Sequence, residues 1–436
     1  MSTTAIFLGL SLLAGSATRP AGTTQASSRP ARILPEVPPD PQVARILGSL
    51  GAGESALLPP AKVTGDLNEA AKRYNLHKNG PGGRNYCVEM VWMADRRRAI
   101  YCGANHGSPH RLNDVWEYDL AGNTWVCLYG PDDLRAGDES FTRAAFRDGA
   151  LVTPRGGPVV MGHQWCQSTY DPATGTMYFN SQWPTGYFPK DVQDKIKSSE
   201  NLHHPPLWSF RPAESTWKPV FPADKPVPAE GTAQNRYLQF IPEVGGLFFA
   251  NANDGMGTWL FNLRTRLWKE LLPGDNASKK ASANPNLPFR VGMRAYCPDR
   301  RLLVVCSEAE GKANRTVEYD VAKNKWSQTA EGPATTAGHV SFTPCGYDPI
   351  SGTALLYDQR KESRGLWAYD VVGKRWAKVV PKGPSPSEGG KIIGYFDPYR
   401  NVFVLIQNTK VWAYRHRIQK RGDEQGRNPQ CRAACV

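Results

Sequence analysis

The chain has 436 residues, 40% of them hydrophobic and 13 of them tryptophan, which is enough for a sizeable core. Its 41 glycines and 36 prolines favour a turn-rich β protein over a helical one. The net charge of +13 favours anionic partners, but part of the excess lies in the tail that begins near Arg415. Because no nucleic-acid-binding motif accompanies this charge, nucleic acid is not an expected partner.

The N-terminus is typical of a secretory signal. An apolar run over residues 5–14 is followed by the small residues Gly15-Ser16-Ala17, although no lysine or arginine precedes the run. A buried helix is the alternative, but the Ser/Thr/Pro-rich segment 18–54 offers it little to pack against. We therefore expect residues 1–17 to be a signal peptide and the protein to be secreted, periplasmic or at the cell surface. No later stretch is long and apolar enough to span a bilayer, so no transmembrane segment is expected.

One short pattern recurs through the rest of the chain: a hydrophobic residue, a spacer, an aromatic residue, and a tryptophan seven positions later. The five copies are Trp116/Tyr118 with Trp125, Trp208/Phe210 with Trp217, Trp259/Phe261 with Trp268, Val317/Tyr319 with Trp326, and Trp367/Tyr369 with Trp376. A sixth copy begins at Trp412/Tyr414 and lacks its final tryptophan. Such self-similarity indicates a fold built from copies of one unit.

Each copy is preceded by two β-like runs that flank a turn. Asp and Pro recur at these turns, where Asp caps the turn and Pro presets φ; examples are Tyr170-Asp171-Pro172, Tyr347-Asp348-Pro349 and Phe396-Asp397-Pro398. Each unit thus has four antiparallel strands, and the units cover roughly 84–130, 156–221, 232–272, 288–329, 338–380 and 388–415. Four-stranded sheets in radial array are the blades of a propeller. The sequence predicts an all-β, six-bladed β-propeller over residues 55–415, followed by a basic polar tail over 416–436.

The incomplete sixth unit predicts how the ring closes. A terminal strand commonly completes such a blade, which leaves no unpaired edge. Residues 55–63 are the best candidate for that strand, and seven blades are the alternative if residues 42–80 supply more than one strand.

These patterns resemble the kelch family of β-propellers, which includes the propeller domain of galactose oxidase. The resemblance runs from about residue 84 to 415 and rests on the aromatic pattern, the Asp-Pro hairpins and strand starts such as Gly162-His163 and Gly338-His339. One family feature is absent: kelch units usually end their second strand in Gly-Gly, whereas this chain has, for example, Phe179-Asn180-Ser181. The copper ligands of galactose oxidase cannot be matched residue by residue, so neither a cofactor nor a metal ion is predicted.

In such a propeller the loops between strands two and three and between successive blades share one end. Two of these segments are outsized, 132–157 and 182–206, and long loops on a rigid scaffold often carry function. We expect the ligand-binding residues at this end: His106, His110, His163, Trp165, Trp183, His204, Arg236 and Arg290.

The histidines are also candidate catalytic residues. His106, His163 and His203 could abstract a proton beside a uronate carboxylate, as in a polysaccharide lyase. His163 and His339 occupy equivalent repeat positions, however, which for these two favours a structural role, hydrogen-bonding the backbone, over a catalytic one. No complete catalytic set is visible.

The preferred interpretation is an exported binding module whose ligand is a glycan or a protein. A lyase-like enzyme acting on an anionic polysaccharide and a structural surface-layer protein are the alternatives, and the oligomeric state stays open. The cysteine count of nine is odd, and Cys87 and Cys102 lie near cross-strand register, where they could form a disulfide.

Overall fold

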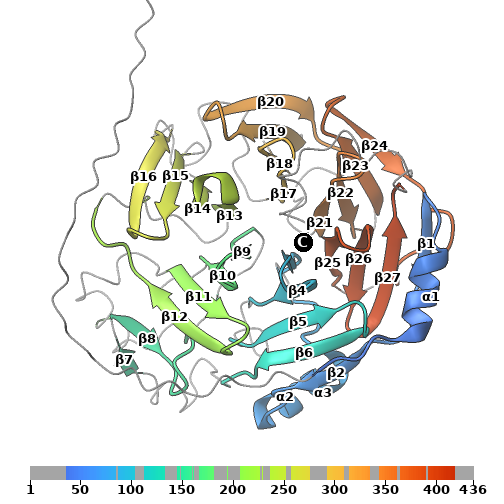
Figure 1. Ribbon diagram of the computed structural model, residues 1–436, viewed down its shortest axis with the longest axis horizontal. Helices are drawn as coiled ribbons and strands as arrows, with labels where there is room; N and C mark the ends of the chain where they lie inside the picture. Colours follow the sequence, from blue (N-terminus) through green and yellow to red (C-terminus); the bar gives the residue numbers. More distant parts are fainter. Residues whose placement is uncertain are drawn as a thin grey trace, which may run out of the picture.

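The computed structural model shows six antiparallel sheets arranged as blades around one axis (Figure 1). It describes residues 36–84, 87–103, 112–132, 145–147, 149–159, 161, 166–180, 194, 207–225, 228, 236–251, 257–274, 292–308, 314–333, 343–360, 364–388 and 391–417. The innermost strands are β3, β9, β13, β17, β21 and β25, and they contact one another between blades one and two, two and three, four and five, five and six, and six and one. The predicted six-bladed propeller is confirmed.

The strands of the first three blades follow the predicted units. Blade one has β3 (Val91–Met93), β4 (Arg98–Tyr101), β5 (Val115–Asp119) and β6 (Thr124–Tyr129). Blade two has β9 (Ser168–Asp171), β10 (Thr176–Phe179), β11 (Leu207–Arg211) and β12 (Thr216–Val220). Blade three has β13 (Arg236–Ile241), β14 (Gly246–Asn251), β15 (Gly257–Asn262) and β16 (Leu267–Leu272). A 3-10 turn, η5 (Pro242–Val244), joins β13 to β14.

The remaining blades repeat this plan. Blade four has β17 (Met293–Cys297), β18 (Leu302–Glu308), β19 (Asn314–Asp320) and β20 (Lys325–Glu331). Blade five has β21 (Cys345–Asp348), β22 (Thr353–Asp358), β23 (Gly365–Asp370) and β24 (Arg375–Val379). Blade six has β25 (Ile393–Asp397), β26 (Val402–Gln407), β27 (Lys410–Arg415) and, as its outermost strand, β1 (Glu54–Leu57).

The N-terminal strand closes the ring, as predicted. Strand β1 pairs antiparallel with β27, which places Ser55 opposite Tyr414. On its other edge the Ser55 N–H donates to the Lys382 carbonyl at 2.8 Å, so that edge is covered as well. Helix α1 (Pro41–Ser49) lies beside this blade, and the Arg415 guanidinium donates to the Leu47 carbonyl at 3.0 Å.

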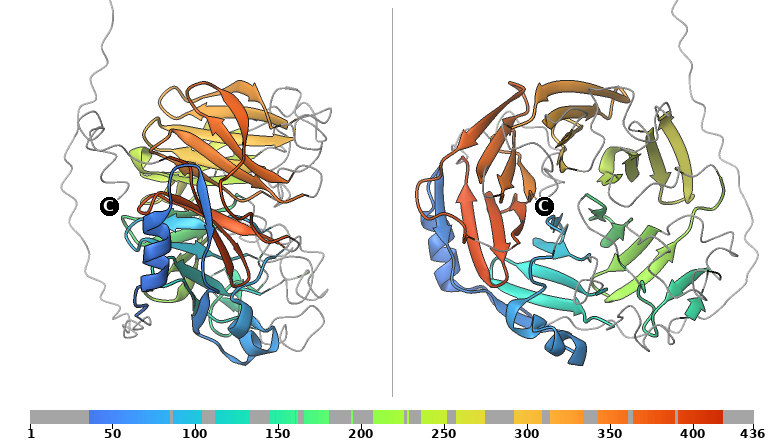
Figure 2. Two further views of the ribbon diagram at one scale, coloured as in Figure 1. Left: turned by 90° about the vertical axis from the view of Figure 1, so that its right-hand side faces the viewer. Right: turned by 180° about the vertical axis from the view of Figure 1, so that it is seen from behind.

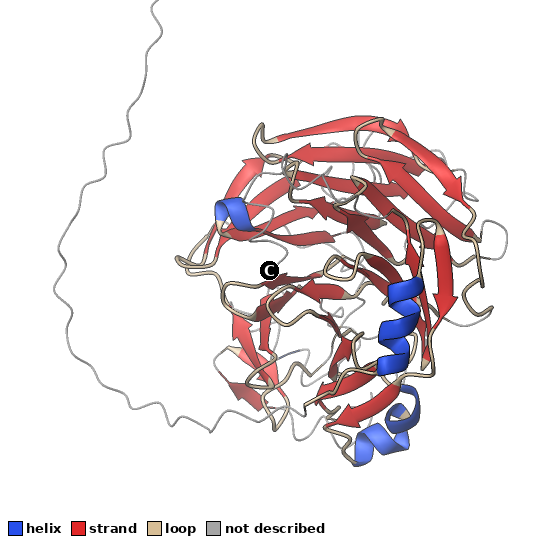
Figure 3. Cartoon of the chain, turned by 45° about the vertical axis from the view of Figure 1, so that its right-hand side comes forward, coloured by secondary structure: helices blue, strands red, loops and turns tan. Residues whose placement is uncertain are grey.

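Residues 42–80 supply two strands, β1 and β2, but no seventh blade, so the seven-bladed alternative is wrong. Strand β2 (Lys62–Gly65) instead adds a fifth strand to blade one by pairing parallel to β6. A separate hairpin of β7 (Ala145–Arg147) and β8 (Ala150–Val152) lies between blades one and two in the chain. The short helices α2 (Glu69–Arg73) and α3 (Leu76–Asn79) sit, like α1, on the outside of the ring, so strands surround the axis (Figure 3).

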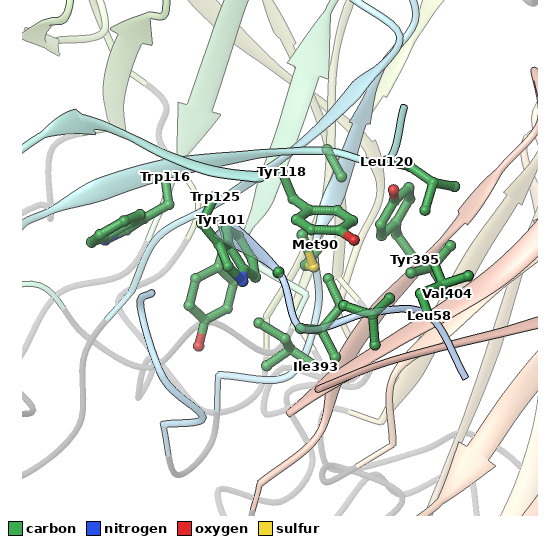
Figure 4. Close-up of a cluster of buried hydrophobic side chains, with 14 of the residues drawn as sticks. Leu58, Met90, Tyr101, Trp116, Tyr118, Leu120, Trp125, Ile393, Tyr395 and Val404 are labelled. Carbon is green, nitrogen blue, oxygen red and sulfur yellow. The ribbon is translucent and has the colours of Figure 1, made fainter. Parts of the chain in front are cut away.

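The repeated tryptophans pack where neighbouring blades meet. Trp125 of blade one is buried in a cluster that includes Tyr395 of blade six, and its ring lies 5.0 Å from that of Tyr118 (Figure 4). Its indole Nε1 donates to the Asn408 carbonyl of blade six at 3.1 Å. An indole thus supplies both apolar surface and one hydrogen bond to the preceding blade.

Blades four and five repeat this bond with a hydroxyl acceptor. Trp326 Nε1 donates to Thr258 Oγ1 of blade three at 2.9 Å, and Trp376 Nε1 donates to Thr316 Oγ1 of blade four at 2.8 Å. The recurring tryptophan is therefore an inter-blade contact, which is why it recurs at one spacing.

In all five complete copies of the pattern, the residue two positions before the tryptophan has a left-handed backbone conformation. The five residues, with their φ angles, are Asn123 (48°), Ser215 (50°), Arg266 (58°), Asn324 (48°) and Lys374 (52°). Asparagine tolerates this conformation best, and Asn123 also accepts from Tyr118 Oη at 2.6 Å and donates to the Pro59 carbonyl at 2.7 Å. The tight turn between strands three and four thus positions both aromatic residues of the pattern.

The predicted Cys87–Cys102 disulfide is wrong. Cys102 is fully buried and keeps its thiol, whose Sγ lies 3.9 Å from Met177 Sδ of blade two. It packs as a small apolar side chain between the two blades. Among the described residues, no helix has the length and apolar character needed to cross a membrane.

Candidate functional site

The two ends of the ring differ in their connections. Because each blade is antiparallel, strand one begins, strand two ends, strand three begins and strand four ends at the same end, which we call the loop-bearing end. Tight turns join strands one to two and three to four at the opposite, hairpin end; Figure 2 shows the ring from the side and from behind. Both outsized segments, 132–157 and 182–206, start and finish at the loop-bearing end.

Buried polar side chains mark the loop-bearing end. Strand two ends in Asn180 beside β10, Asn251 in β14, Ser307 near the end of β18 and Asp358 in β22, and all four are buried. The middle of the same strands is apolar, as in the buried run 247–250 of β14. Polar side chains therefore gather at the loop-bearing end in blades two to five.

Arg236 is the one predicted ligand-binding residue that the structure describes. It is the first residue of β13 and is buried, and its Nη1 donates to Asn180 Oδ1 of blade two at 3.2 Å. Its guanidinium carbon lies 5.9 Å from the ring centroid of Phe249. Arg236 lies at the predicted end and ties blade three to blade two; its role in binding stays a prediction.

The other predicted residues belong to segments attached to the same end. They lie outside the described residues: His106, His110, His163, Trp165, Trp183, His203, His204 and Arg290. Their roles in binding or catalysis stay predictions.

A buried ion pair holds the start of blade one. Arg84 Nη2 lies 2.6 Å from Asp114 Oδ2, and its Nη1 donates to the Gly103 carbonyl at 2.6 Å. The Trp116 indole also donates to Asp114 Oδ2, at 2.5 Å. These bonds fasten both ends of the segment between β4 and β5, so we assign Arg84 and Asp114 a structural role.

A second buried ion pair crosses the centre of the ring. Arg294 Nη2 of β17 lies 2.6 Å from Glu89 Oε1, which stands just before β3, and also donates to the Ser168 carbonyl of β9 at 3.1 Å. Blades one and four are opposite one another in a six-membered ring, so the pair spans the axis. Gln167 precedes Ser168 at the same end. We call Glu89, Gln167 and Arg294 the axial cluster.

The axial cluster has more hydrogen-bonding capacity than the described part of the chain uses. Its three side chains are 6%, 0% and 5% exposed, respectively. Five of their atoms have no hydrogen-bond partner there: Nε and Nη1 of Arg294, Oε2 of Glu89, and Oε1 and Nε2 of Gln167. Because leaving a buried polar atom unpaired costs about 1–3 kcal/mol, such a cluster is typical of a site that receives further groups.

Burial sets the ionisation of the cluster. It raises the pKa of the Glu89 carboxyl to about 7, although the Arg294 charge opposes this shift. Burial alone would lower the pKa of Arg294, but the Glu89 carboxylate outweighs it and holds that pKa above its ordinary value. Near neutral pH the Arg294 guanidinium is therefore charged, and the Glu89 carboxyl is partly protonated and partly ionised.

Two thiols border the cluster. Cys166 Sγ donates to the Gly292 carbonyl at 3.0 Å, and Cys345 Sγ donates to the Arg294 carbonyl at 3.1 Å. Burial raises the pKa of both thiols, that of Cys345 to about 12, so they stay neutral. In the described ranges no group of three or more His, Cys, Asp or Glu side chains is placed to hold a metal ion.

No family model matches the chain, and no curated protein matches it. The solved structures similar to it include a GH74 xyloglucanase from Xanthomonas campestris, at 14% identity and a TM-score of 0.43 over 76% of this chain and 52% of that one. The chain thus spans about half of that enzyme's length.

Two shorter proteins are similar over most of their length. An oligogalacturonate lyase from Vibrio parahaemolyticus is 11% identical, with a TM-score of 0.38 over 76% of this chain and 90% of that one. A gluconolactonase from Xanthomonas campestris is 10% identical, with a TM-score of 0.42 over 84% of this chain and 98% of that one.

Proposed function

We propose that the protein is an exported binding module that recognises a glycan at its loop-bearing end. The observation that carries this proposal is the set of buried polar side chains at that end in blades two to five, where Asn180, Asn251, Ser307 and Asp358 replace the apolar residues of the strand interiors. Polar groups held by rigid strands at one end of the fold can provide the fixed donors and acceptors that specific recognition needs.

Two further features support a glycan as the ligand. The outsized segments 132–157 and 182–206 are attached to this end and contain the aromatic residue Trp183, which could stack on a sugar ring. The net charge of +13 favours an anionic ligand over a neutral one.

A matched pair of aromatic substitutions tests the proposal. We would immobilise the full chain and measure retention of a panel of neutral and uronate-containing oligosaccharides. Trp183→Ala, in the segment between β10 and β11, should weaken binding about tenfold, which corresponds to a loss of about 1.4 kcal/mol of binding free energy. Tyr399→Ala is the control, since Tyr399 lies in the turn between β25 and β26 at the hairpin end and is 50% exposed. The proposal fails if the Tyr399 variant loses binding and the Trp183 variant keeps it.

A lyase-like enzyme is the second candidate function. The observation in its favour is the Glu89 carboxyl, whose pKa of about 7 suits a general base at neutral pH and which lies beside the cationic Arg294. The predicted catalytic residues His106, His163 and His203 belong to segments of the sequence whose flanking strands begin or end at the loop-bearing end. Incubation with uronate polysaccharides would produce a new absorbance from an unsaturated sugar end if this candidate is correct; a constant absorbance across the panel leaves the binding module.

We also propose that the six units are divergent kelch repeats and that residues 1–17 direct export. The aromatic pattern and the Asp-Pro hairpins support the first proposal, and the apolar run over residues 5–14 supports the second. N-terminal sequencing of the protein made by its native host tests export. A mature chain that begins near residue 18 is expected, and a chain that retains Met1 would contradict it.

A further inference from the structure

We propose that the axial cluster is a carboxylate-binding site: Arg294 and Gln167 hold the carboxyl group of a uronate unit, and Glu89 accepts a hydrogen bond from a neighbouring sugar hydroxyl. This inference rests on the proposed glycan binding and names the chemistry that the ligand must carry. It also places the centre of recognition on the axis, where the innermost strands of blades one, two and four converge.

The unused atoms of the cluster define what a ligand must offer. Three donors, Nε and Nη1 of Arg294 and Nε2 of Gln167, need acceptors, and two acceptors, Glu89 Oε2 and Gln167 Oε1, need donors. A carboxylate supplies only acceptors, and it forms its strongest hydrogen bonds with a guanidinium. A sugar hydroxyl supplies the missing donor. A uronate carries both groups on one ring, whereas a neutral sugar lacks the charge that a buried guanidinium favours.

Arg294 already forms an ion pair with Glu89. The protonation state of Glu89 therefore decides how tightly Arg294 binds a second carboxylate, that of the uronate. When Glu89 is protonated, the cluster carries a charge of +1 and attracts a carboxylate. When Glu89 is ionised, the cluster is neutral overall, and the Glu89 carboxylate repels a second carboxylate. The charged or titratable groups that face Glu89 are Arg294 and the thiols of Cys166 and Cys345. Neither the guanidinium nor the thiols change their protonation between pH 6 and 8, and the sugar carboxyl is ionised throughout. Affinity for a uronate should therefore fall as the pH rises across that range.

Gln167→Leu tests the site without removing a contact that the fold uses. Leucine has a similar size, and replacing an unpaired buried amide with an apolar group is close to neutral for stability or improves it. We would titrate oligomers of galacturonate and mannuronate into the full-length wild type and variant by calorimetry, with their methyl esters as uncharged counterparts. The variant should keep the wild-type unfolding midpoint or exceed it, and its affinity for the acids should fall about tenfold.

The matched control is Gln239→Leu. Gln239 lies within β13, the innermost strand of blade three, and its Nε2 donates to the Phe240 carbonyl rather than to the axial cluster. This variant should bind the acids as the wild type does. A second measurement uses Glu89→Gln, whose uncharged side chain should remove the fall in uronate affinity between pH 6 and 8.

The possible outcomes distinguish a failure of the proposed carboxylate site from a failure of the proposed glycan-binding function. Equal binding of the acids and their esters by the wild type, or unchanged affinity in Gln167→Leu, would overturn the carboxylate site while leaving glycan binding intact. A wild type that retains neither these oligomers nor any glycan of the panel would overturn the carboxylate site and the proposed function together. Tenfold weaker binding by Gln167→Leu alone, together with a pH dependence that Glu89→Gln abolishes, supports the site.

Discussion

The buried Glu89 carboxyl predicts a specific pH dependence of stability. Its pKa rises from the ordinary value of 4.5 to about 7 on folding, because burial penalises the charged form. At this site the folded protein therefore binds a proton more tightly than the unfolded chain does, so the stability that Glu89 contributes is greatest below pH 4.5 and falls as the pH approaches 7. At 1.36 kcal/mol for each pH unit, this shift corresponds to about 3 kcal/mol, all of which has been lost above pH 7.

The assay compares the wild type with Glu89→Gln. Urea unfolding followed by the fluorescence of the 13 tryptophans would give the free energy of unfolding at half-unit steps from pH 4.5 to 8. The absolute stabilities will differ because the variant loses the carboxylate beside Arg294, so the quantity that matters is how the difference changes with pH. We expect the wild type to lose about 3 kcal/mol relative to the variant between pH 4.5 and 7.5. A difference that is constant or grows in favour of the wild type would show that the arginine outweighs burial, and would refute this reasoning.

Two further predictions concern the architecture. Trp125→Ala should lower the free energy of unfolding by about 4 kcal/mol, since it removes a fully buried indole between blades one and six. Trp376→Ala should lower it by about half as much, because that indole is partly exposed. Urea unfolding measures both losses, and equal losses would contradict the inter-blade role of the tryptophans. Deletion of residues 1–58 removes β1 and exposes the edge of β27, so size-exclusion chromatography should show oligomers or aggregates; a monomer that unfolds at the full-length midpoint would contradict closure by the N-terminal strand.

The fold could be predicted because its contacts repeat. The spacing from Tyr118 to Trp125 recurs in four more blades, since each tryptophan must reach back to the preceding blade from a turn of constant length. The absent sixth tryptophan strand also identified the closing segment, which the structure places at β1. Strand β2 was missed because it belongs to no repeat: Lys62 pairs with Thr124, 62 positions away, and adds a parallel edge that the other blades lack.

The candidate site was predictable only in part. The blade topology correctly assigns Arg236 to the loop-bearing end, because strand one of every blade begins there. Repeat spacing gives the register within a blade. It does not show which residues, at the beginnings of the innermost strands, contact one another across the axis. Glu89 and Arg294 are 205 positions apart, and no motif links them. A charged residue close to the apolar innermost strand Val91–Met93, as at Glu89, is the signal that could have found part of the cluster.

The most direct test of the account is a crystal structure of the full chain soaked with an oligomer of galacturonate. The account predicts ligand density at the loop-bearing end, with the sugar carboxylate within hydrogen-bonding distance of Arg294 and Gln167. Ordered water alone at the axial cluster, with the oligomer bound among the turns of the hairpin end, would contradict it.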